Sequence, residues 1–270
     1  MPQLSLIISF YQKIEYLELV FAGLCQQTFK DYEIIIADDG SEEKIVQQVK
    51  ALGKSFSLPF HHVWQEDKGF RKNKILNTAI NSSNTTYLVF IDGDCIPHPQ
   101  FLFEHFQNKK EGACLTGRRV DMSETFTKKL TSKKIENGYI QKNLYQLFYE
   151  SFFWKSFNVE KGLYIKNTFL RKIFNKKRRG ILGSNFSLHK KDILAINGFD
   201  ERYEEYSIGE DTDIQYRLEL NGIQIQSVNN MAIQYHLYHK KREPSLKNLE
   251  LFEEVKKEKK AYTSFGIVKA

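Results

Sequence analysis

The chain has 270 residues, of which 41% are hydrophobic, 14% aromatic and 27% charged. This composition is typical of folded globular proteins and excludes disordered and fibrous classes. The three cysteines, Cys25, Cys95 and Cys114, have no CxxC spacing, so neither a disulfide framework nor a zinc knuckle is predicted, and a reducing cytoplasm fits best. No uncharged apolar run approaches the roughly 18 residues of a membrane-spanning helix, and residues 1–3 lack the basic region of a signal peptide.

Charge is unevenly distributed along the chain. The 40 basic and 33 acidic residues give a net charge of +7. Residues 1–100 carry 9 basic and 12 acidic side chains, a net charge of −3, so residues 101–270 carry +10. Residues 166–191 include nine basic side chains and no acidic one. Such a run indicates an anionic partner, whether phosphates, anionic lipid or nucleic acid, or else a solvated surface loop.

Short apolar runs alternate with stretches of helical periodicity in the first hundred residues. The apolar runs predict strands at residues 4–10, 32–37, 60–64 and 87–91. The periodic stretches predict helices at residues 16–27, 42–52 and 72–81. This alternation predicts an α/β fold, with a Rossmann-like, mostly parallel central sheet and helices on both faces.

The pattern is looser in the rest of the chain. Residues 121–143 are rich in Lys, Thr and Ser and predict a mobile connection. Residues 144–157 contain seven aromatic side chains and predict a helix with a broad aromatic face. That face suits packing in the core or between domains, or else an interfacial helix or a platform for a sugar. Further on, we expect a helix at 214–220, a strand at 231–235 and a surface helix at 246–262.

Acidic residues follow the predicted strands, and ligands of open α/β sheets bind beyond the carboxyl ends of the strands. Asp92 and Asp94 flank a glycine at the end of the fourth predicted strand. Side chains two residues apart on a strand share one face, so both carboxylates are expected to face one cleft. Mg²⁺ or Mn²⁺ held there would also bind the phosphates of a nucleotide diphosphate. The alternative is an ordinary Asp-Gly turn.

Two further segments suit a nucleotide. Asp39, after the second predicted strand, could accept a hydrogen bond from a base such as uracil while Tyr11 stacks on the ring. The alternative is that this segment only begins a helix, with Ser41 as its N-cap. Residues 68–74, including Arg71, place four cations at a predicted helix start, which favours a bound phosphate, a neighbouring carboxylate or a solvated face.

Residues of the second half could supply a base and a further metal ligand. Asp211, with Glu210 as the alternate, could take the proton from an acceptor hydroxyl, although acidic residues also favour a helix start. His236 and His239 follow the predicted strand at 231–235. Histidine pairs are commonly structural or solvated, but His236 could complete the coordination of a divalent metal.

Together, these motifs resemble those of the family 2 glycosyltransferases, which have the GT-A nucleotide-diphospho-sugar fold. The motifs of the first half are residues 4–11 (Leu-Ser-Leu-Ile-Ile-Ser-Phe-Tyr), 26–29 (Gln-Gln-Thr-Phe), 31–41, 68–71 (Lys-Gly-Phe-Arg) and 92–94 (Asp-Gly-Asp). Residues 183–188, 197–200 and 209–211 resemble the galactosyl- or N-acetylgalactosaminyl-transferase branch, which includes bacterial chondroitin-polymerase-like domains.

The resemblance implies a role for each matching residue. Tyr11 and Asp39 would contact uridine, Arg71 the diphosphate, Asp92 the ribose, Asp94 and His236 the metal, and Asp211 would be the base, while Ser9 of the first motif is expected at the donor site. We expect one GT-A catalytic domain at 1–240, with a donor half (1–95) and an acceptor half (96–240), and a C-terminal helical extension at 241–270.

The resemblance also implies the reaction. We expect a metal-dependent, inverting transfer of a hexose or N-acetylhexosamine from a UDP-sugar to a glycan or lipid-linked saccharide in cell-surface polysaccharide synthesis, with Mn²⁺ or Mg²⁺ as cofactor. The expected location is the cytoplasm, with peripheral contact to an anionic membrane and no nucleic-acid partner. The alternatives are a sugar-phosphate nucleotidyltransferase, whose glycine-rich loop is missing after the first strand, and a non-catalytic basic module that binds polyanions or membranes.

Overall fold

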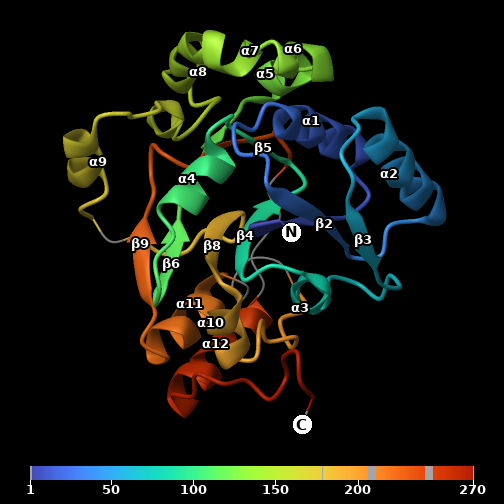
Figure 1. Cartoon of the computed structure of the whole chain (residues 1–270), viewed down its shortest axis with the longest axis vertical. Coiled ribbons are helices and arrows are strands. Elements are labelled where there is room, and N and C mark those ends of the chain that lie inside the picture. Colours follow the sequence, from blue (N-terminus) through green and yellow to red (C-terminus); the bar gives the residue numbers. More distant parts are fainter. Residues whose placement is uncertain (1, 178, 206–210, 241–245, 270) are drawn as a thin grey trace.

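The computed structural model describes residues 2–177, 179–205, 211–240 and 246–269. Its main sheet comprises β1 (Leu4–Phe10), β2 (Tyr32–Asp38), β3 (His61–Trp64), β4 (Tyr87–Asp92), β6 (Ala113–Thr116), β8 (Asn185–His189) and β9 (Gln224–Ser227). These seven strands lie in the order β3-β2-β1-β4-β8-β6-β9 (Figure 1). Strand β8 is antiparallel to β4 and β6, and the other pairs are parallel. The predicted α/β fold with a mostly parallel sheet is confirmed.

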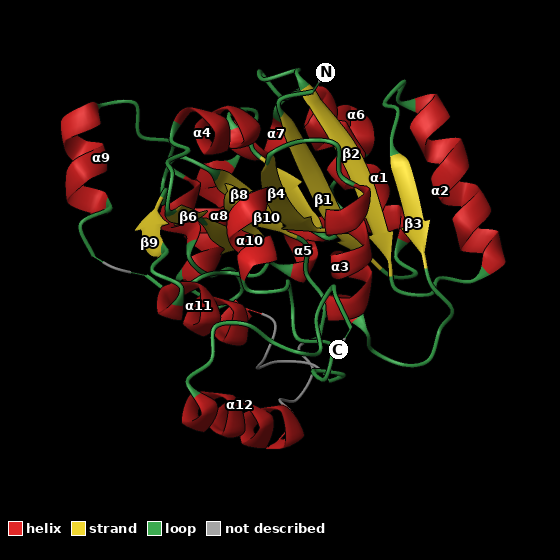
Figure 2. Ribbon diagram, turned by 60° about the horizontal axis from the view of Figure 1, so that its bottom comes forward, coloured by secondary structure: helices red, strands yellow, loops and turns green. Residues whose placement is uncertain are grey.

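Helices cover both faces of this sheet (Figure 2). They include α1 (Ile14–Cys25), α2 (Glu43–Ser55), α3 (Lys72–Ser82), α4 (Phe101–Gln107), α10 (Lys190–Ala195) and α11 (Asp211–Leu220). Strand β1 shows the alternation of side chains: Leu6 and Ile8 pack in a core with α1, α2 and α4, whereas Ile7 packs with α3, α10 and α11. Since both faces are covered, the strand is apolar along almost its whole length.

A small second sheet extends the carboxyl end of β4. It consists of β5 (Cys95–Pro97), β10 (Ile233–His236) and β7 (Arg118–Asp121), in the order β5-β10-β7. Strand β10 is antiparallel to β5 and parallel to β7. This sheet therefore joins residues that are more than a hundred positions apart in the chain.

The expectation that residues 121–143 form a mobile connection is wrong. They fold into α5 (Glu124–Lys128), α6 (Ser132–Glu136) and α7 (Tyr139–Lys142), at the top of Figure 1. Phe126, Ile135 and Ile140 are buried in a third core cluster together with Tyr235 and Leu237. A few well-spaced apolar side chains thus hold a segment that is otherwise polar.

The aromatic segment at 144–157 also differs from expectation. Its helix, α8 (Leu144–Ser151), ends six residues early, and in α8 only Leu147 is fully buried. Five aromatic side chains are each more than half exposed, namely Tyr145, Tyr149, Phe152, Phe153 and Trp154. The expectation of core packing is therefore wrong for these residues, since none of the five belongs to the third core cluster.

The chain continues through the 3-10 helix η1 (Val159–Gly162) and α9 (Thr168–Phe174). Near the C-terminus, α12 (Leu246–Glu258) packs on α11, with the rings of Tyr216 and Phe252 6.0 Å apart. The division into a catalytic domain and a C-terminal extension stays a prediction. Within the described residues, no helix is both long enough and apolar enough to cross a membrane.

A buried ion pair within α11 gives a test of this core. Arg217 and Asp213 are both almost fully buried, with Nη2 and Oδ2 2.7 Å apart. Asp213→Ala would leave the guanidinium without its counter-charge, so we expect the free energy of unfolding to fall by about 3–5 kcal/mol in urea titrations. Glu253→Ala, which breaks the more exposed Lys256 pair on α12, should change it little. Equal effects of the two substitutions would contradict this assignment.

Candidate functional site

The carboxyl ends of β1 and β4 bring Ser9 next to Asp92. The two residues are Cα partners in the parallel register, and the Ser9 hydroxyl donates to Asp92 Oδ1 at 2.6 Å. Lys72, at the start of α3, places its Nζ 2.8 Å from the same oxygen. The structure thus joins two residues expected at the donor site and adds Lys72. The cation run at residues 68–74 was the signal for this lysine, but its spacing did not show which cation reaches the carboxylate.

Asp94 lies beyond the turn at Gly93 and faces other partners. Its Oδ2 is 3.3 Å from His239 Nε2 and 3.6 Å from His236 Nε2. The two Nε2 atoms are 3.2 Å apart. The two carboxylates of the Asp-Gly-Asp motif therefore contact different elements: Asp92 meets β1 and α3, and Asp94 meets the end of β10 and the segment that follows it.

The histidines and Asp94 shift one another's pKa. Burial alone would raise the pKa of Asp94, but its hydrogen bonds to His236 and His239 outweigh burial and hold the pKa well below the usual range. Burial opposes the charged form of His236, yet its bonds to Asp121 and Asp94 raise the pKa to about 9. The bond to Asp94 also raises the pKa of His239. At neutral pH, His236 is thus protonated when no cation competes for it.

Asp121 is the second carboxylate that contacts His236, and the sequence reasoning missed it. Asp121 Oδ1 lies 3.2 Å from His236 Nδ1 and 2.9 Å from Arg119 Nε, while Asn158 Nδ2 donates to its Oδ2 at 2.9 Å. Burial alone would raise the pKa of Asp121, but these partners outweigh burial and lower the pKa to about 2. Asp121 thus stays ionised and orients the imidazole so that Nε2 faces Asp94. Nothing in the local sequence at Arg119 or Asp121 signals this role.

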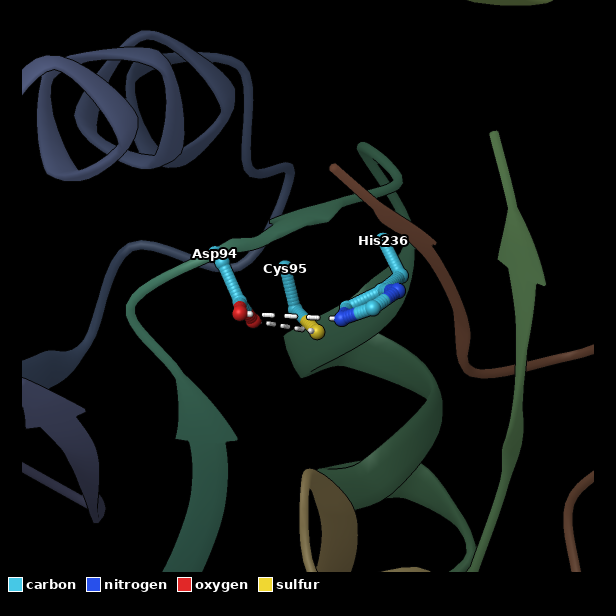
Figure 3. Close-up of side chains that lie close together, drawn as sticks. All are labelled: Asp94, Cys95 and His236. Carbon is cyan, nitrogen blue, oxygen red and sulfur yellow. Dashed lines mark hydrogen bonds and ion pairs between the residues drawn. The ribbon is translucent and has the colours of Figure 1, made fainter. Parts of the chain in front are cut away.

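The donor atoms around Asp94 fit a divalent cation. Neighbouring ligands of an octahedral ion at about 2.1 Å lie about 3 Å apart, close to the 3.2–3.6 Å among Asp94 Oδ2 and the two Nε2 atoms. Cys95 Sγ is also within 4.8 Å of Asp94 and His236 (Figure 3). Burial raises the pKa of the Cys95 thiol well above its usual value, and sulfur is a softer ligand than the oxygen and nitrogen atoms that suit Mg²⁺ and Mn²⁺. His239 suits a metal better than Cys95 does.

Asp39 and Tyr11 lie beyond the ends of β2 and β1. Asp39 is nearly buried, and its oxygens accept from Gln65 Nε2 at 2.5 Å and from the Arg71 backbone N–H at 2.9 Å. Burial raises the pKa of Asp39. The Tyr11 ring is 40% exposed, and its hydroxyl donates to Asp67 Oδ2 at 2.9 Å. Tyr11 thus offers an exposed aromatic face near the Asp39 carboxylate. The oxygens of Asp39 retain lone pairs that could accept further hydrogen bonds.

Arg71 and Asp211 have no described contact with Asp92, Asp94 or His236. The Arg71 guanidinium donates to the backbone oxygen of Glu66, and its side chain lines a pocket with Lys74 and Glu201. Its backbone, by contrast, supports Asp39.

Asp211 is the first residue of α11 in the structure, and its Oδ2 accepts weakly from the Gly183 N–H at 3.4 Å. Glu210 lies outside the described residues. The proposed base and its alternate therefore stay predictions. Asp213, two positions on, is a structural residue, since its carboxylate is paired with Arg217.

Comparison with known families decides the identity of the chain. Residues 5–176, more than half of the chain, match the model described as glycosyl transferase family 2. The chain belongs to glycosyltransferase family 2. Residues 168–240 of this glycosyltransferase also match the model described as the N-terminal domain of galactosyltransferase. The resemblance inferred from the motifs is confirmed.

Curated relatives agree with this family. The glycosyltransferase is 28% identical over 251 residues to the chondroitin synthase of Escherichia coli, covering 86% of this chain and 34% of that protein. It is 23% identical over 248 residues to the hyaluronan synthase of Pasteurella multocida, covering 86% of this chain and 24% of that protein. The chain thus spans about a third or less of the length of these two relatives.

Solved structures confirm a GT-A-like fold. TarS 1–349 of S. aureus, in complex with UDP-GlcNAc, is 17% identical with a TM-score of 0.57, covering 90% of this chain and 60% of that one. The mannosyltransferase PcManGT of Pyrobaculum calidifontis, in complex with GDP-Man and Mn²⁺, is 13% identical with a TM-score of 0.58, covering 89% and 58%. At these identities the likeness concerns the fold.

The contact between Asp121 and His236 predicts a supporting role in metal binding. We expect Asp121→Ala to weaken Mn²⁺ binding by about tenfold or more, because His236 loses the partner that orients its ring. Asp121→Asn, which keeps an oxygen acceptor, should lose less. Affinity is measured by the electron paramagnetic resonance signal of free Mn²⁺. Glu124→Gln, an exposed carboxylate nearby on α5, is the control and should bind like wild type. Wild-type affinity in Asp121→Ala would show that Asp121 has no part in the metal site.

Proposed function

We propose that this glycosyltransferase moves a hexose or N-acetylhexosamine from a UDP-sugar to a hydroxyl of a glycan or lipid-linked saccharide in cell-surface polysaccharide synthesis. The observation that carries the proposal is the convergence of Asp94 Oδ2 with His236 Nε2 and His239 Nε2, close in the chain to Asp92 at the carboxyl end of β4. Mn²⁺ or Mg²⁺ bound there would neutralise the diphosphate and help UDP to leave.

Side chains at the ends of β1, β2 and β4 suit the nucleoside of the donor. The nearly buried Asp39 carboxylate accepts from the uracil N–H, and the exposed ring of Tyr11 stacks on the base. Asp92, held by Ser9 and Lys72, contacts the ribose. The Lys72 ammonium supplies positive charge beside Asp92. The Arg71 guanidinium contacts the diphosphate of the donor. The UDP-GlcNAc named for the TarS complex supports a UDP-linked donor.

Membership of family 2 favours sugar transfer over the nucleotidyl-transfer alternative. The anomeric carbon would be attacked directly by the acceptor hydroxyl on the face opposite to UDP, so its configuration inverts. Asp211 would accept the hydroxyl proton as the new C–O bond forms and the bond to UDP breaks. Within the described residues, its carboxylate has a weak bond to the Gly183 N–H and one to the Thr212 hydroxyl, which leaves lone pairs for this proton.

Donor binding is tested by thermal unfolding with UDP, GDP, TDP and CMP, each with and without Mn²⁺. A ligand that binds only the folded state raises the unfolding midpoint. We expect a shift with UDP that requires Mn²⁺ and is lost in Asp94→Asn. Asp31→Asn is the matched control, because Asp31 is exposed and lies just before β2, at the amino ends of the parallel strands and not at the carboxyl ends, where the site is. A shift that is independent of Mn²⁺, or that persists in Asp94→Asn, would contradict the metal site. No shift with any nucleotide would overturn the donor site.

The role of Asp211 is tested separately from binding. We expect Asp211→Asn to lower sugar transfer by about 10²–10⁴-fold, because the amide cannot accept the hydroxyl proton. The UDP-dependent thermal shift should stay at its wild-type size. Glu219→Gln, also on α11, is the control and should transfer sugar normally. Normal turnover of Asp211→Asn, measured by UDP release with an accepted saccharide, would remove Asp211 from the role of base.

A further inference from the structure

Helix α9 projects from the body of the protein and has no buried residue. In both views it lies at the left edge, apart from the sheet (Figures 1 and 2). Its apolar side chains are widely exposed, namely Phe169 (68%), Leu170 (43%), Ile173 (53%) and Phe174 (48%). Four large apolar residues on one short helix are more than the scattered exposure that is ordinary on protein surfaces.

Polar contacts hold this helix in place. Arg171 makes a two-pronged ion pair with the buried Glu104, at 2.6 and 3.1 Å. At the other end, Asn175 donates to the backbone oxygen of Asn229 at 3.1 Å and accepts from its N–H at 2.7 Å. At 100° per residue, Arg171 and Asn175 lie on the same side of the helix. Phe169 and Ile173 lie on the opposite side and Leu170 and Phe174 on one flank, and all four are exposed, so the anchors leave the apolar side chains facing outward.

Basic residues surround the apolar face. Lys166 precedes α9, Lys172 lies on it, and Lys176 and Lys177 follow it; all four are exposed. Within the described residues, none of these four lysines has an ion pair. Lys176 and Lys177 also line a pocket of about 680 Å³ beside β9. An outward apolar stripe bordered by unpaired lysines is the pattern of a helix that lies in the interface of an anionic membrane.

We infer that α9 and the lysines around it dock this protein on an anionic bilayer. The apolar face enters the boundary between headgroups and acyl chains, and the lysines contact lipid phosphates. A protein partner bound to α9 would cover Phe169 and Ile173, but it would also have to supply acidic groups for the lysines or remove them from water. An anionic lipid surface satisfies both features at once. This inference does not rest on the proposed reaction, because none of these residues contacts Asp92, Asp94 or His236 in the described chain.

The inference is tested by sedimentation with vesicles of phosphatidylcholine alone and of phosphatidylcholine with phosphatidylglycerol. We expect binding to the anionic vesicles at low salt, weaker binding at high salt and little binding to the neutral vesicles. Phe169→Ser/Phe174→Ser and, separately, Lys176→Glu/Lys177→Glu should each lower the partition coefficient on the order of tenfold or more. All substituted side chains are exposed, so the unfolding midpoint should not change.

Matched controls change similar side chains elsewhere. Leu246→Ser removes an exposed apolar residue on α12, and Lys44→Glu/Lys50→Glu reverses two exposed charges on α2, at the other side of the molecule. Both should bind vesicles like wild type. Absence of binding at low salt, or equal binding to neutral vesicles, would overturn the inference. A dimer that Phe169→Ser/Phe174→Ser dissociates would show instead that a second copy covers α9. The UDP-dependent thermal shift, measured in parallel, reports the donor site independently.

Discussion

Strand β10 is hydrogen-bonded between β5 and β7, and its register determines which side chains meet at the candidate site. His236 is the Cα partner of Cys95 on one side and of Asp121 on the other, so these side chains form a row on one face. Ile233, Tyr235 and Leu237 are buried on the opposite face, in the third core cluster. A slip by one residue would turn Tyr235 towards Asp94 and His236 into the core. Apolar burial thus fixes the position of the imidazole.

Each carboxylate of the site is matched by a cation from a different element. Lys72 of α3 pairs with Asp92, His236 and His239 with Asp94, and Arg119 with Asp121. Because the pKa of His236 is raised to about 9, the imidazolium supplies positive charge between two carboxylates at neutral pH. A divalent cation that binds Nε2 would replace this proton. The charges of the cluster are therefore balanced by protein side chains alone, and a proton and a metal ion would compete for His236 Nε2.

Much of the donor half could be predicted from the sequence, because periodicity reports local structure. Strand β1 has the expected bounds; Asp39 follows β2, Asp92 is the last residue of β4, and Asp94 lies two residues further on. What could not be predicted depends on contacts between distant segments. Lys72 and Arg71 are adjacent, and only the orientation of α3 decides that Lys72 reaches Asp92. Asp121 has no motif, and its role arises from pairing with a strand more than a hundred residues away.

Contacts between distant segments also explain why the predictions from apolar content were wrong for the segments that follow β7. Residues 121–143 contain few apolar side chains, yet Phe126, Ile135 and Ile140 are buried because Tyr235 and Leu237 offer them an apolar surface. Residues 144–174 are richer in aromatic side chains but meet polar neighbours, such as Glu104 at α9. Burial depends on the surface available in the folded chain, and Phe126, Ile135 and Ile140 find such a surface in the third core cluster. Helix α9 is held by polar contacts to Glu104 and Asn229, so its apolar face is left to contact something outside the chain.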